Sequence, residues 1–289
     1  MTMQRKLLLL GSSGKMGSAV REVLEGGYAL LCKNSRDFDA RDSSQVKDLI
    51  EAYRPDIVVN AAAFTGIDQC EKAPEEALRI NTLYPRLLAE LSNEFGFLLV
   101  HFSTDAVFNN SKGDYYSESD NPGPLNIYGF TKYGGDCFIR AIAETYYIFR
   151  ISLLFGNSQR NTQFVERMLQ KVVDGETHLR IADDIVSSPS YSHDVAREIK
   201  RILECGLPFG LYHVANEGKP SLYELIREII ETIGWDVDIE RASHRDFPAS
   251  GVKNTYTPIR SEKINRLRPW KDAVKEYCDY LSTKKSKGL

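Results

Sequence analysis

The chain has 289 residues, of which 42% are hydrophobic and 27% are charged, with a net charge of -3. This is the composition of an ordinary globular protein, long enough for one large domain with a smaller lobe. The lack of a basic block outside the KKSKG segment argues against nucleic-acid binding, and no apolar run is long enough to span a membrane.

Apolar runs alternate with helical patterns through the first half of the chain. They predict strands at residues 6–10, 28–32, 56–63, 97–104 and 146–156, and helices at residues 16–26, 44–53, 75–95 and 128–144. Continuous apolar strands are typical of a sheet that is covered on both faces. The alternation therefore predicts an α/β fold with a doubly wound parallel sheet, the Rossmann arrangement.

The pattern becomes less regular after Gly156. It predicts helices at residues 164–174, 192–203 and 221–233, strands at 178–182 and 210–216, and a last helix from residue 271; the third of these helices begins with a capping box. We predict a dinucleotide-binding domain over residues 1–156, to which segments near 190–215 add. Residues 157–289 would form a smaller α/β lobe that binds the substrate.

The segment GSSGKMG follows the first strand directly and opens the first helix. Its three glycines, Gly11, Gly14 and Gly17, allow a tight turn, a close approach to a pyrophosphate, and packing of the helix against the strand. The helix N-terminus would face the phosphates with its partial positive charge. In this context the loop predicts a dinucleotide site.

The end of the second strand bears on the choice of cofactor. Lys33, Ser35 and Arg36 suit a 2′-phosphate better than a free hydroxyl, and an arginine can pair with phosphate through two hydrogen bonds. Asp37 could instead accept from the hydroxyl of NADH, and a solvated turn would also explain the segment. We expect NADPH, with NADH as the alternative.

Tyr128 and Lys132 are one helical turn apart and can reach the same cavity. A phenol can donate a proton to a carbonyl that is being reduced, and a nearby cation favours its ionised form. Ser103 and Thr104 end the fourth predicted strand. An isolated pair of this kind is usually an ordinary surface pair, so the interpretation depends on the surrounding motifs.

Taken together, GSSGKMG, NAAAFTGIDQCE, STDAVF, PLNIYGFTK and FRISLLFG resemble the extended short-chain dehydrogenase/reductases. Within them the chain is most similar to the dTDP-4-dehydrorhamnose reductase family. The resemblance implies reduction of the 4-keto group of a nucleotide-linked 6-deoxysugar, with dTDP-4-dehydro-L-rhamnose going to dTDP-L-rhamnose.

The resemblance also implies roles for individual residues. Tyr128 would donate the proton, Lys132 would hold the nicotinamide ribose and lower the pKa of the phenol, and Thr104 with Ser103 would orient the carbonyl. The further residues implied to bind the cofactor are Ser13, Lys15, Met16, Asp39, Ala62, Ala63 and Thr65, besides the loop glycines and Arg36. Those implied to bind the substrate are Thr104, Asp105, Leu153, Phe164 and Arg260, with Arg150, Arg160 and Lys253 as other available cations.

The chain departs from the family at several positions. Ala106 replaces an aromatic residue and Leu153 replaces a tryptophan, which predicts a reshaped sugar pocket. Ser188 and Ser190 replace a glycine and a threonine. Lys15 stands where some members have an acidic residue for a magnesium-bridged dimer, so a homodimer would need another means of association.

Two other interpretations remain open. The chain could be a reductase or an epimerase acting on another nucleotide sugar. It could also be a noncatalytic, NADP-binding regulatory subunit of methionine adenosyltransferase, since that branch can keep the same Tyr and Lys.

The five cysteines are scattered and form no CxxC pair, and the five histidines show no metal-ligand spacing. We therefore expect neither a disulfide framework nor a metal site. The N-terminal apolar run is too short for a signal peptide, and a reducing cytoplasm fits best.

Overall fold

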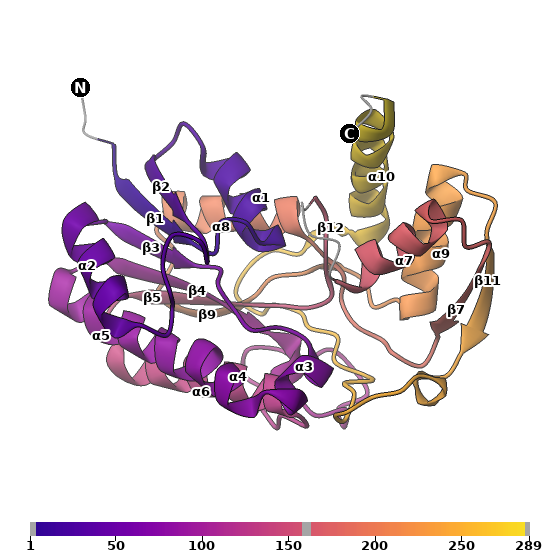
Figure 1. The fold of residues 1–289 in the computed structure, drawn as a ribbon, viewed down its shortest axis with the longest axis horizontal. Helices are drawn as coiled ribbons and strands as arrows, with labels where there is room; N and C mark the ends of the chain where they lie inside the picture. Colours follow the sequence, from indigo (N-terminus) through magenta and orange to yellow (C-terminus); the bar gives the residue numbers. More distant parts are fainter. Residues whose placement is uncertain (1–3, 158–162, 287–289) are drawn as a thin grey trace.

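A parallel sheet forms the centre of the computed structural model, which describes residues 4–157 and 163–286 (Figure 1). Six strands of this part lie in the order β2-β1-β3-β4-β5-β9. They are β1 (Lys6–Leu10), β2 (Ala29–Lys33), β3 (Ile57–Asn60), β4 (Leu98–Thr104), β5 (Tyr146–Ile151) and β9 (Gly210–His213). The predicted doubly wound parallel sheet is confirmed.

The run of leucines in β1 explains why this strand lies inside the sheet. Leu7 and Leu9 pack into the core on one face, and Leu8 and Leu10 pack into the core on the other. Because successive side chains of a strand point to opposite faces, a strand covered on both sides must be apolar throughout.

Helices cover the two faces of the sheet unequally (Figure 1). On one face lie α1 (Lys15–Leu24) and α8 (Ser192–Cys205), which pack against each other. On the other face lie α2 (Ser43–Tyr53), α5 (Tyr84–Phe95) and α6 (Ile127–Ile142), and α3 (Ile67–Lys72) and α4 (Pro74–Leu78) extend this layer. The order leaves the carboxyl ends of β1, β3, β4 and β5 facing the second lobe.

The single helix predicted over residues 75–95 is wrong in one respect. A π-helical turn, η1 (Arg79–Leu83), separates α4 from α5. Pro85 has no N–H to donate to Asn81 four residues before it, so the regular α-helical ladder is interrupted there. The turn places the Asn81 side chain against Phe64, with hydrogen bonds of 2.9 Å from the Phe64 N–H and 2.8 Å to its carbonyl.

The strands predicted over residues 56–63 and 146–156 are shorter than expected. The first ends at Asn60, and the second stops at Ile151 because Leu153 has a φ of 20°, which extended backbone does not allow. The chain resumes as β6 (Leu154–Phe155), which pairs with β8 (Ser190–Tyr191). Both interruptions leave irregular backbone at the edge of the sheet.

The second lobe packs around its own core beside the carboxyl edge of the sheet (Figure 1). It contains α7 (Phe164–Val173), α9 (Leu222–Ile233) and α10 (Trp270–Ser286) with the parallel pair β7 (His178–Ala182) and β11 (Asp238–Ala242). The predicted capping box at Ser221 and Glu224 is present. Shorter elements are η2 (Asp105–Val107), β10 (Asn216–Glu217), η3 (His244–Asp246) and β12 (Leu267–Pro269).

Candidate active site

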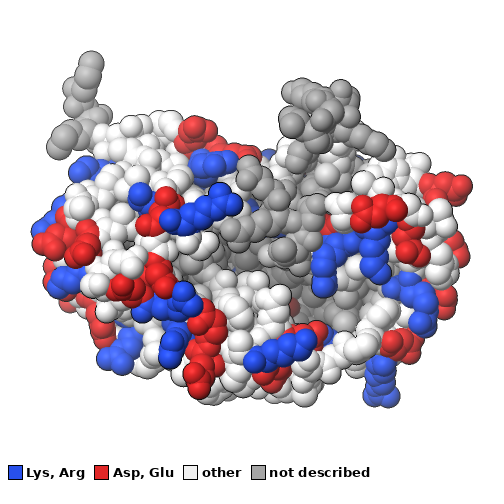
Figure 2. Space-filling model, in the orientation of Figure 1, with Lys and Arg blue, Asp and Glu red and all other residues white. Residues whose placement is uncertain are grey.

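A cavity of about 1260 Å³ lies between the carboxyl edge of the sheet and the second lobe. Loops after β1, β3, β4 and β5 line one side, and α7 with the segment around η3 lines the other. Ligands of open α/β sheets bind at this edge of the sheet. In Figure 2, Lys and Arg side chains gather beside the hollow on the side of the second lobe.

The glycine loop forms one end of the cavity. Gly11 has a φ of 82°, and a Cβ there would lie 2.6 Å from the Ala62 nitrogen. Gly17 does not line the cavity; a Cβ on it would lie 2.2 Å from the Gly11 carbonyl oxygen, so it serves the packing of α1. Gly11, Ser13, Gly14, Lys15 and Met16 do line the cavity, and the N-terminus of α1 opens onto it. This bare backbone fits a pyrophosphate.

Lys15 has a partner that sequence reasoning missed. Its Nζ forms an ion pair with the Glu166 carboxylate on α7 and donates to the Leu154 carbonyl at 3.3 Å. Both charged side chains are buried. Burial lowers the pKa of Lys15, and Glu166 opposes that shift. The pair therefore joins the glycine loop to the second lobe.

The segment after β2, residues 35–41, lines the same cavity as the glycine loop. Arg36 lines it, and its guanidinium makes no ion pair within the described part of the chain. Asp39 also lines it but is held by Arg41, with hydrogen bonds of 2.8 Å to each carboxylate oxygen, and these lower the pKa of Asp39. Arg41 also pairs with Glu76 at 3.3 Å, a contact that the sequence did not reveal. At this end of the cavity, Arg36 is thus a cation that is left for an anionic ligand.

Small residues continue this wall towards the centre of the cavity. Ala62, Ala63 and Thr65, which the resemblance assigns to the cofactor, line it. The Asn81 side chain fixes the backbone of Phe64 within this run. An alanine wall leaves room for a flat ring next to the strand end.

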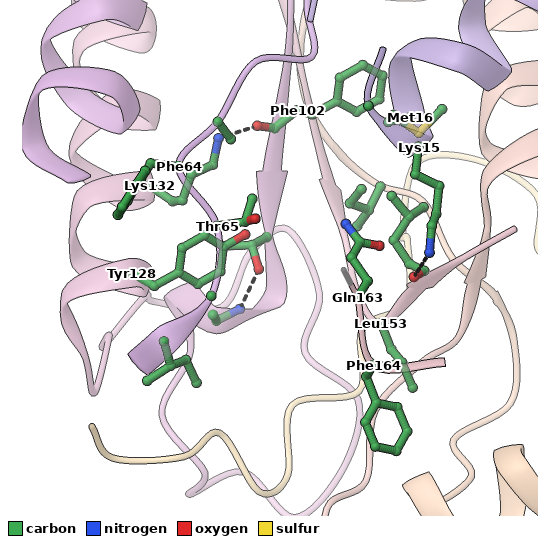
Figure 3. Close-up of a pocket in the computed structure, with 18 of the residues that line it drawn as sticks. Lys15, Met16, Phe64, Thr65, Phe102, Tyr128, Lys132, Leu153, Gln163 and Phe164 are labelled. Carbon is green, nitrogen blue, oxygen red and sulfur yellow. Dashed lines mark hydrogen bonds between the residues drawn. The ribbon is translucent and has the colours of Figure 1, made fainter. Parts of the chain in front are cut away.

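Tyr128 and Lys132 come from α6, and Figure 3 shows them on the wall that faces Leu153, Gln163 and Phe164. The helix begins at Asn126, whose side chain accepts from the Gly129 N–H at 2.9 Å. This cap fixes the first turn, so the phenol projects into the cavity.

The phenol of Tyr128 stays protonated in the protein alone. Burial raises its pKa, and a hydrogen bond with Thr104 opposes the shift. We expected Lys132 to lower this pKa, but burial dominates and the net shift is upward. Lys132 is itself buried, which lowers its own pKa to about 8.

The end of β4 and the start of η2 place three more predicted residues in the lining of the cavity. Thr104 Oγ1 accepts from the Ala106 N–H at 3.1 Å, which orients the hydroxyl. Ser103 Oγ is buried and has no hydrogen-bond partner within the described residues. Asp105 accepts from Thr257 at 2.6 Å, and burial raises the pKa of its carboxyl. An unpartnered hydroxyl in the lining of the cavity suits a ligand oxygen.

The wall of the cavity that faces the phenol carries two apolar side chains. Leu153 and Phe164 line it, and Gln163 Oε1 is buried without a hydrogen-bond partner in the described chain. Leu153 adopts its positive φ at this wall. Backbone held in a sparsely populated region often marks a ligand site.

The structure does not bring all the predicted cations together. Lys253 lines the cavity and pairs with Asp68 at 3.3 Å. Arg260 does not line it; its guanidinium lies 3.7 Å from the centre of the Tyr115 ring. Arg150 is buried in an ion pair with Asp136, and Arg160 falls outside the described residues.

Sequence reasoning missed a cationic stretch on the lobe side. Arg167 and Lys171 are one turn apart on α7 and line the cavity, and neither has an ion pair within the described residues. Arg180 on β7 also lines it but is held by Asp246 at 2.9 Å. The spacing of Arg167 and Lys171 was the only available signal, and it is equally common on solvated helices.

Two absences complete the description of the site. Across residues 4–157 and 163–286, no group of three or more His, Cys, Asp or Glu side chains is arranged to hold a metal ion. In the same residues, no helix has both the length and the apolar character needed to cross a membrane.

Comparison with known proteins identifies the family of the chain. The family model described as RmlD substrate binding domain matches residues 5–283. The chain is 33% identical to the spore coat polysaccharide biosynthesis protein SpsK of Bacillus subtilis, covering 96% of this chain and 98% of that protein. It is 30% identical to the dTDP-4-dehydrorhamnose reductase of Escherichia coli, covering 96% and 98%.

A solved structure gives the same result. The dTDP-4-dehydrorhamnose reductase of Bacillus anthracis, in complex with NADP, superposes with a TM-score of 0.91 at 28% identity, covering 96% of this chain and all of that one. The predicted resemblance is confirmed: the chain belongs to the RmlD substrate-binding-domain family, whose named relatives include dTDP-4-dehydrorhamnose reductases.

Proposed function

We propose that the protein is an NADPH-dependent reductase of the 4-keto group of a nucleotide-linked 6-deoxysugar, with dTDP-4-dehydro-L-rhamnose as its substrate and dTDP-L-rhamnose as its product. The observation that carries this proposal is the protonated phenol of Tyr128 beside the Thr104 hydroxyl, in the cavity that the glycine loop also lines. Reductases of this name among the relatives support the substrate.

In this reaction some residues of the chain bind the reactants and one transfers a proton. Bound NADPH would supply a hydride to the carbonyl carbon. Tyr128 Oη then donates its proton to the carbonyl oxygen, where negative charge develops, while Thr104 and Ser103 hydrogen-bond the same oxygen. Lys132 places its amino group one turn behind the phenol, where it can hold a ribose hydroxyl.

The cofactor would lie along the carboxyl edge of the sheet. The loop from Gly11 to Met16 would hold the pyrophosphate, and Ala62, Ala63 and Thr65 would border the nicotinamide half. Arg36, which has no ion pair within the described chain, supports NADPH over NADH because a guanidinium can bind the 2′-phosphate through two hydrogen bonds.

The nucleotide sugar would occupy the side of the second lobe. Leu153 and Phe164 would contact the sugar, and Asp105 would complete this end of the pocket. Arg167 and Lys171 are better placed for the diphosphate than Arg260, because they line the cavity and have no competing ion pair in the described residues.

An NADPH-oxidation assay tests the function directly. The protein is mixed with NADPH or NADH and with each of a panel of dTDP-, GDP- and UDP-4-keto-6-deoxysugars. We expect turnover with the dTDP sugar and a lower KM for NADPH than for NADH. Turnover with another member of the panel instead would identify that sugar as the substrate. If no sugar of the panel is reduced, the proposed reductase function is wrong.

The two alternatives give different results in the same experiment. An epimerase would purify with bound dinucleotide and would consume no NADPH. A noncatalytic regulatory subunit would bind NADPH, oxidise none with any sugar, and co-purify with a methionine adenosyltransferase.

We also propose the division into a cofactor domain over residues 1–156, with segments near 190–215, and a substrate lobe over residues 157–289. The placement of β9 in the main sheet supports it. A cytoplasmic location is supported by the five cysteines, all of which are free. We propose a homodimer held without a bridging metal, which light scattering with and without a chelator would test.

A further inference from the structure

Buried polar atoms without a hydrogen-bond partner are gathered in the lining of the cavity. Within residues 4–157 and 163–286, the side-chain oxygens of Ser103, Gln163 and Ser187 are of this kind. A polar atom that is buried without a partner costs the free energy of its desolvation, so native structures contain few of them. Their presence in one cavity indicates that a ligand supplies the missing partners.

Gln163 differs from the two serines in how its oxygen can be satisfied. A serine hydroxyl turns its hydrogen to suit the neighbours that it has, and Ser103 is already assigned to the carbonyl that is reduced. The oxygen of an amide only accepts, so Gln163 Oε1 needs a donor. Within the described residues, no donor reaches it.

The side chain of Gln163 does not cap the helix that it precedes. Gln163 is the N-cap residue of α7, with extended backbone at a φ of -93° and a ψ of 168°, but its side chain accepts no hydrogen bond from the first turn. Asn, Asp, Ser and Thr are the usual N-cap residues, because their shorter side chains reach those N–H groups. The amide is therefore left for the cavity that it lines.

The neighbours of Gln163 give this wall one polar group beside two apolar ones. Figure 3 shows Gln163 with Leu153 and Phe164 on the wall that faces Tyr128. In a 4-keto-6-deoxysugar, one neighbour of the keto carbon carries a hydroxyl and the other carries a methyl group. The wall therefore matches both substituents of a ring whose carbonyl lies at the phenol.

The amide can reach a bound sugar by turning. Its oxygen is buried in the free protein, but the residue as a whole is half-buried. Rotation about the side-chain bonds can therefore bring the amide to a ligand, and the hydrogen bond that forms there favours the turn. A hydroxyl both donates and accepts, so it satisfies the amide whichever way the amide group faces.

We propose that Gln163 is a specificity-determining residue which binds the hydroxyl on C3 of the sugar, the carbon next to the keto group. The assignment rests on the proposed reductase function, because it takes the carbonyl to lie at Tyr128. C1 carries the nucleotide and C5 carries the methyl group, so the free ring hydroxyls are those on C2 and C3, and only C3 is bonded to the reacting carbon. A sugar without this hydroxyl would leave the amide unpaired and would bind weakly.

Gln163→Met tests the unpartnered oxygen without any ligand. Methionine keeps the length of the side chain and removes both polar atoms of the amide. We expect a Tm at least as high as that of the wild type, because the variant no longer buries an unsatisfied oxygen. A clearly lower Tm would show that the amide has a structural partner and would overturn the proposal. Because the measurement needs no substrate, it stands even if the reductase function fails.

Calorimetric titration with dTDP-L-rhamnose and with its 3-deoxy and 2-deoxy analogues tests the hydroxyl. The wild type should bind the 3-deoxy sugar about 10–100-fold more weakly than dTDP-L-rhamnose, and Gln163→Met should bind the two equally. Gln170→Met is the matched control and should keep the preference of the wild type. Gln170 lies on the same helix, donates to Asp174 at 2.8 Å and does not line the cavity.

The outcomes separate this inference from the function on which it rests. Equal binding of the first two sugars by the wild type would overturn the inference alone, and so would a preference for the 3-hydroxyl that survives in Gln163→Met. A preference for the 2-hydroxyl that Gln163→Met removes instead would also overturn the assignment to C3. If the wild type binds none of the three sugars, the proposed function is wrong as well.

Discussion

Lys15 Nζ and the Glu166 carboxylate form a buried ion pair that ties the glycine loop to the first helix of the second lobe. The pair lies at the place where the cofactor's pyrophosphate is proposed to bind. A buried charge that loses its partner costs about 3–5 kcal/mol. Glu166→Gln should therefore lower the free energy of unfolding by about that amount in the protein without cofactor.

Bound NADPH should restore part of the loss in Glu166→Gln, because phosphate replaces the missing carboxylate as the partner of Lys15. Thermal unfolding with and without NADPH measures both effects. Glu90→Gln is a matched control, since Glu90 pairs with Arg86 at 2.8 Å but both are exposed. Such a pair contributes at most about 1 kcal/mol. Equal effects of the two substitutions would contradict a structural role for the buried pair.

Tyr128→Phe should lower kcat by about 10²–10⁴-fold and leave the affinity for NADPH nearly unchanged. The phenyl ring keeps the packing but cannot donate a proton. Steady-state NADPH oxidation measures kcat, and fluorescence titration measures the affinity. Tyr133→Phe, on the same helix but outside the cavity wall, should keep near-normal kcat. Comparable turnover in both variants would show that another group supplies the proton.

The sequence predicted the sheet and the glycine loop because their signals are local. Each strand from β1 to β5 contains a run of apolar residues, and the loop glycines are adjacent to the elements they connect. The Tyr128 and Lys132 pair could be predicted for a related reason, since both residues lie one turn apart on one helix.

The rest depends on contacts between residues far apart in the chain. Nothing in the sequence around Glu166 indicates that it pairs with Lys15, because 151 positions separate them. The π-helical turn at Asn81 was missed because the surrounding residues keep a helical apolar period. Arg260 was assigned from a motif, and only the fold shows its guanidinium on the Tyr115 ring instead of in the cavity.

Arg36→Ala should raise the KM for NADPH by about 10–100-fold and leave the KM for NADH nearly unchanged. A charge-assisted hydrogen bond contributes about 1.5–3 kcal/mol, and only NADPH has the phosphate to accept it. Lys33→Ala is the matched control, because Lys33 ends β2 without lining the cavity. An equal change in KM for both cofactors would show that Arg36 does not bind the 2′-phosphate of NADPH.

The contribution of Lys132 to the stability of the protein should increase between about pH 8 and pH 10. Burial lowers the pKa of Lys132 from 10.5 to about 8, so in this range the unfolded chain binds the proton more tightly than the folded one. The contribution of this group to the free energy of unfolding then rises with pH, on the order of 3 kcal/mol in total. The free energies of unfolding of the wild type and of Lys132→Met, measured with urea, should diverge over this range because only the wild type gains stability from this group. Parallel curves would mean that Lys132 titrates normally in the folded state.

Gly11→Ala should abolish NADPH binding, whereas Gly26→Ala should not affect it. The two glycines have nearly the same φ, 82° and 79°, so both substitutions carry the same backbone strain of about 1–2 kcal/mol. They differ in space: a Cβ on Gly11 would lie 2.6 Å from the Ala62 nitrogen, and a Cβ on Gly26 would meet nothing within 4 Å. Relief of the Gly11 collision must move either the glycine loop or the alanine wall, and both border the cofactor. Calorimetric titration with NADPH measures the affinity, and chemical unfolding measures the strain common to both. Tight NADPH binding by Gly11→Ala would show that cofactor affinity does not depend on the close approach of the glycine loop to Ala62.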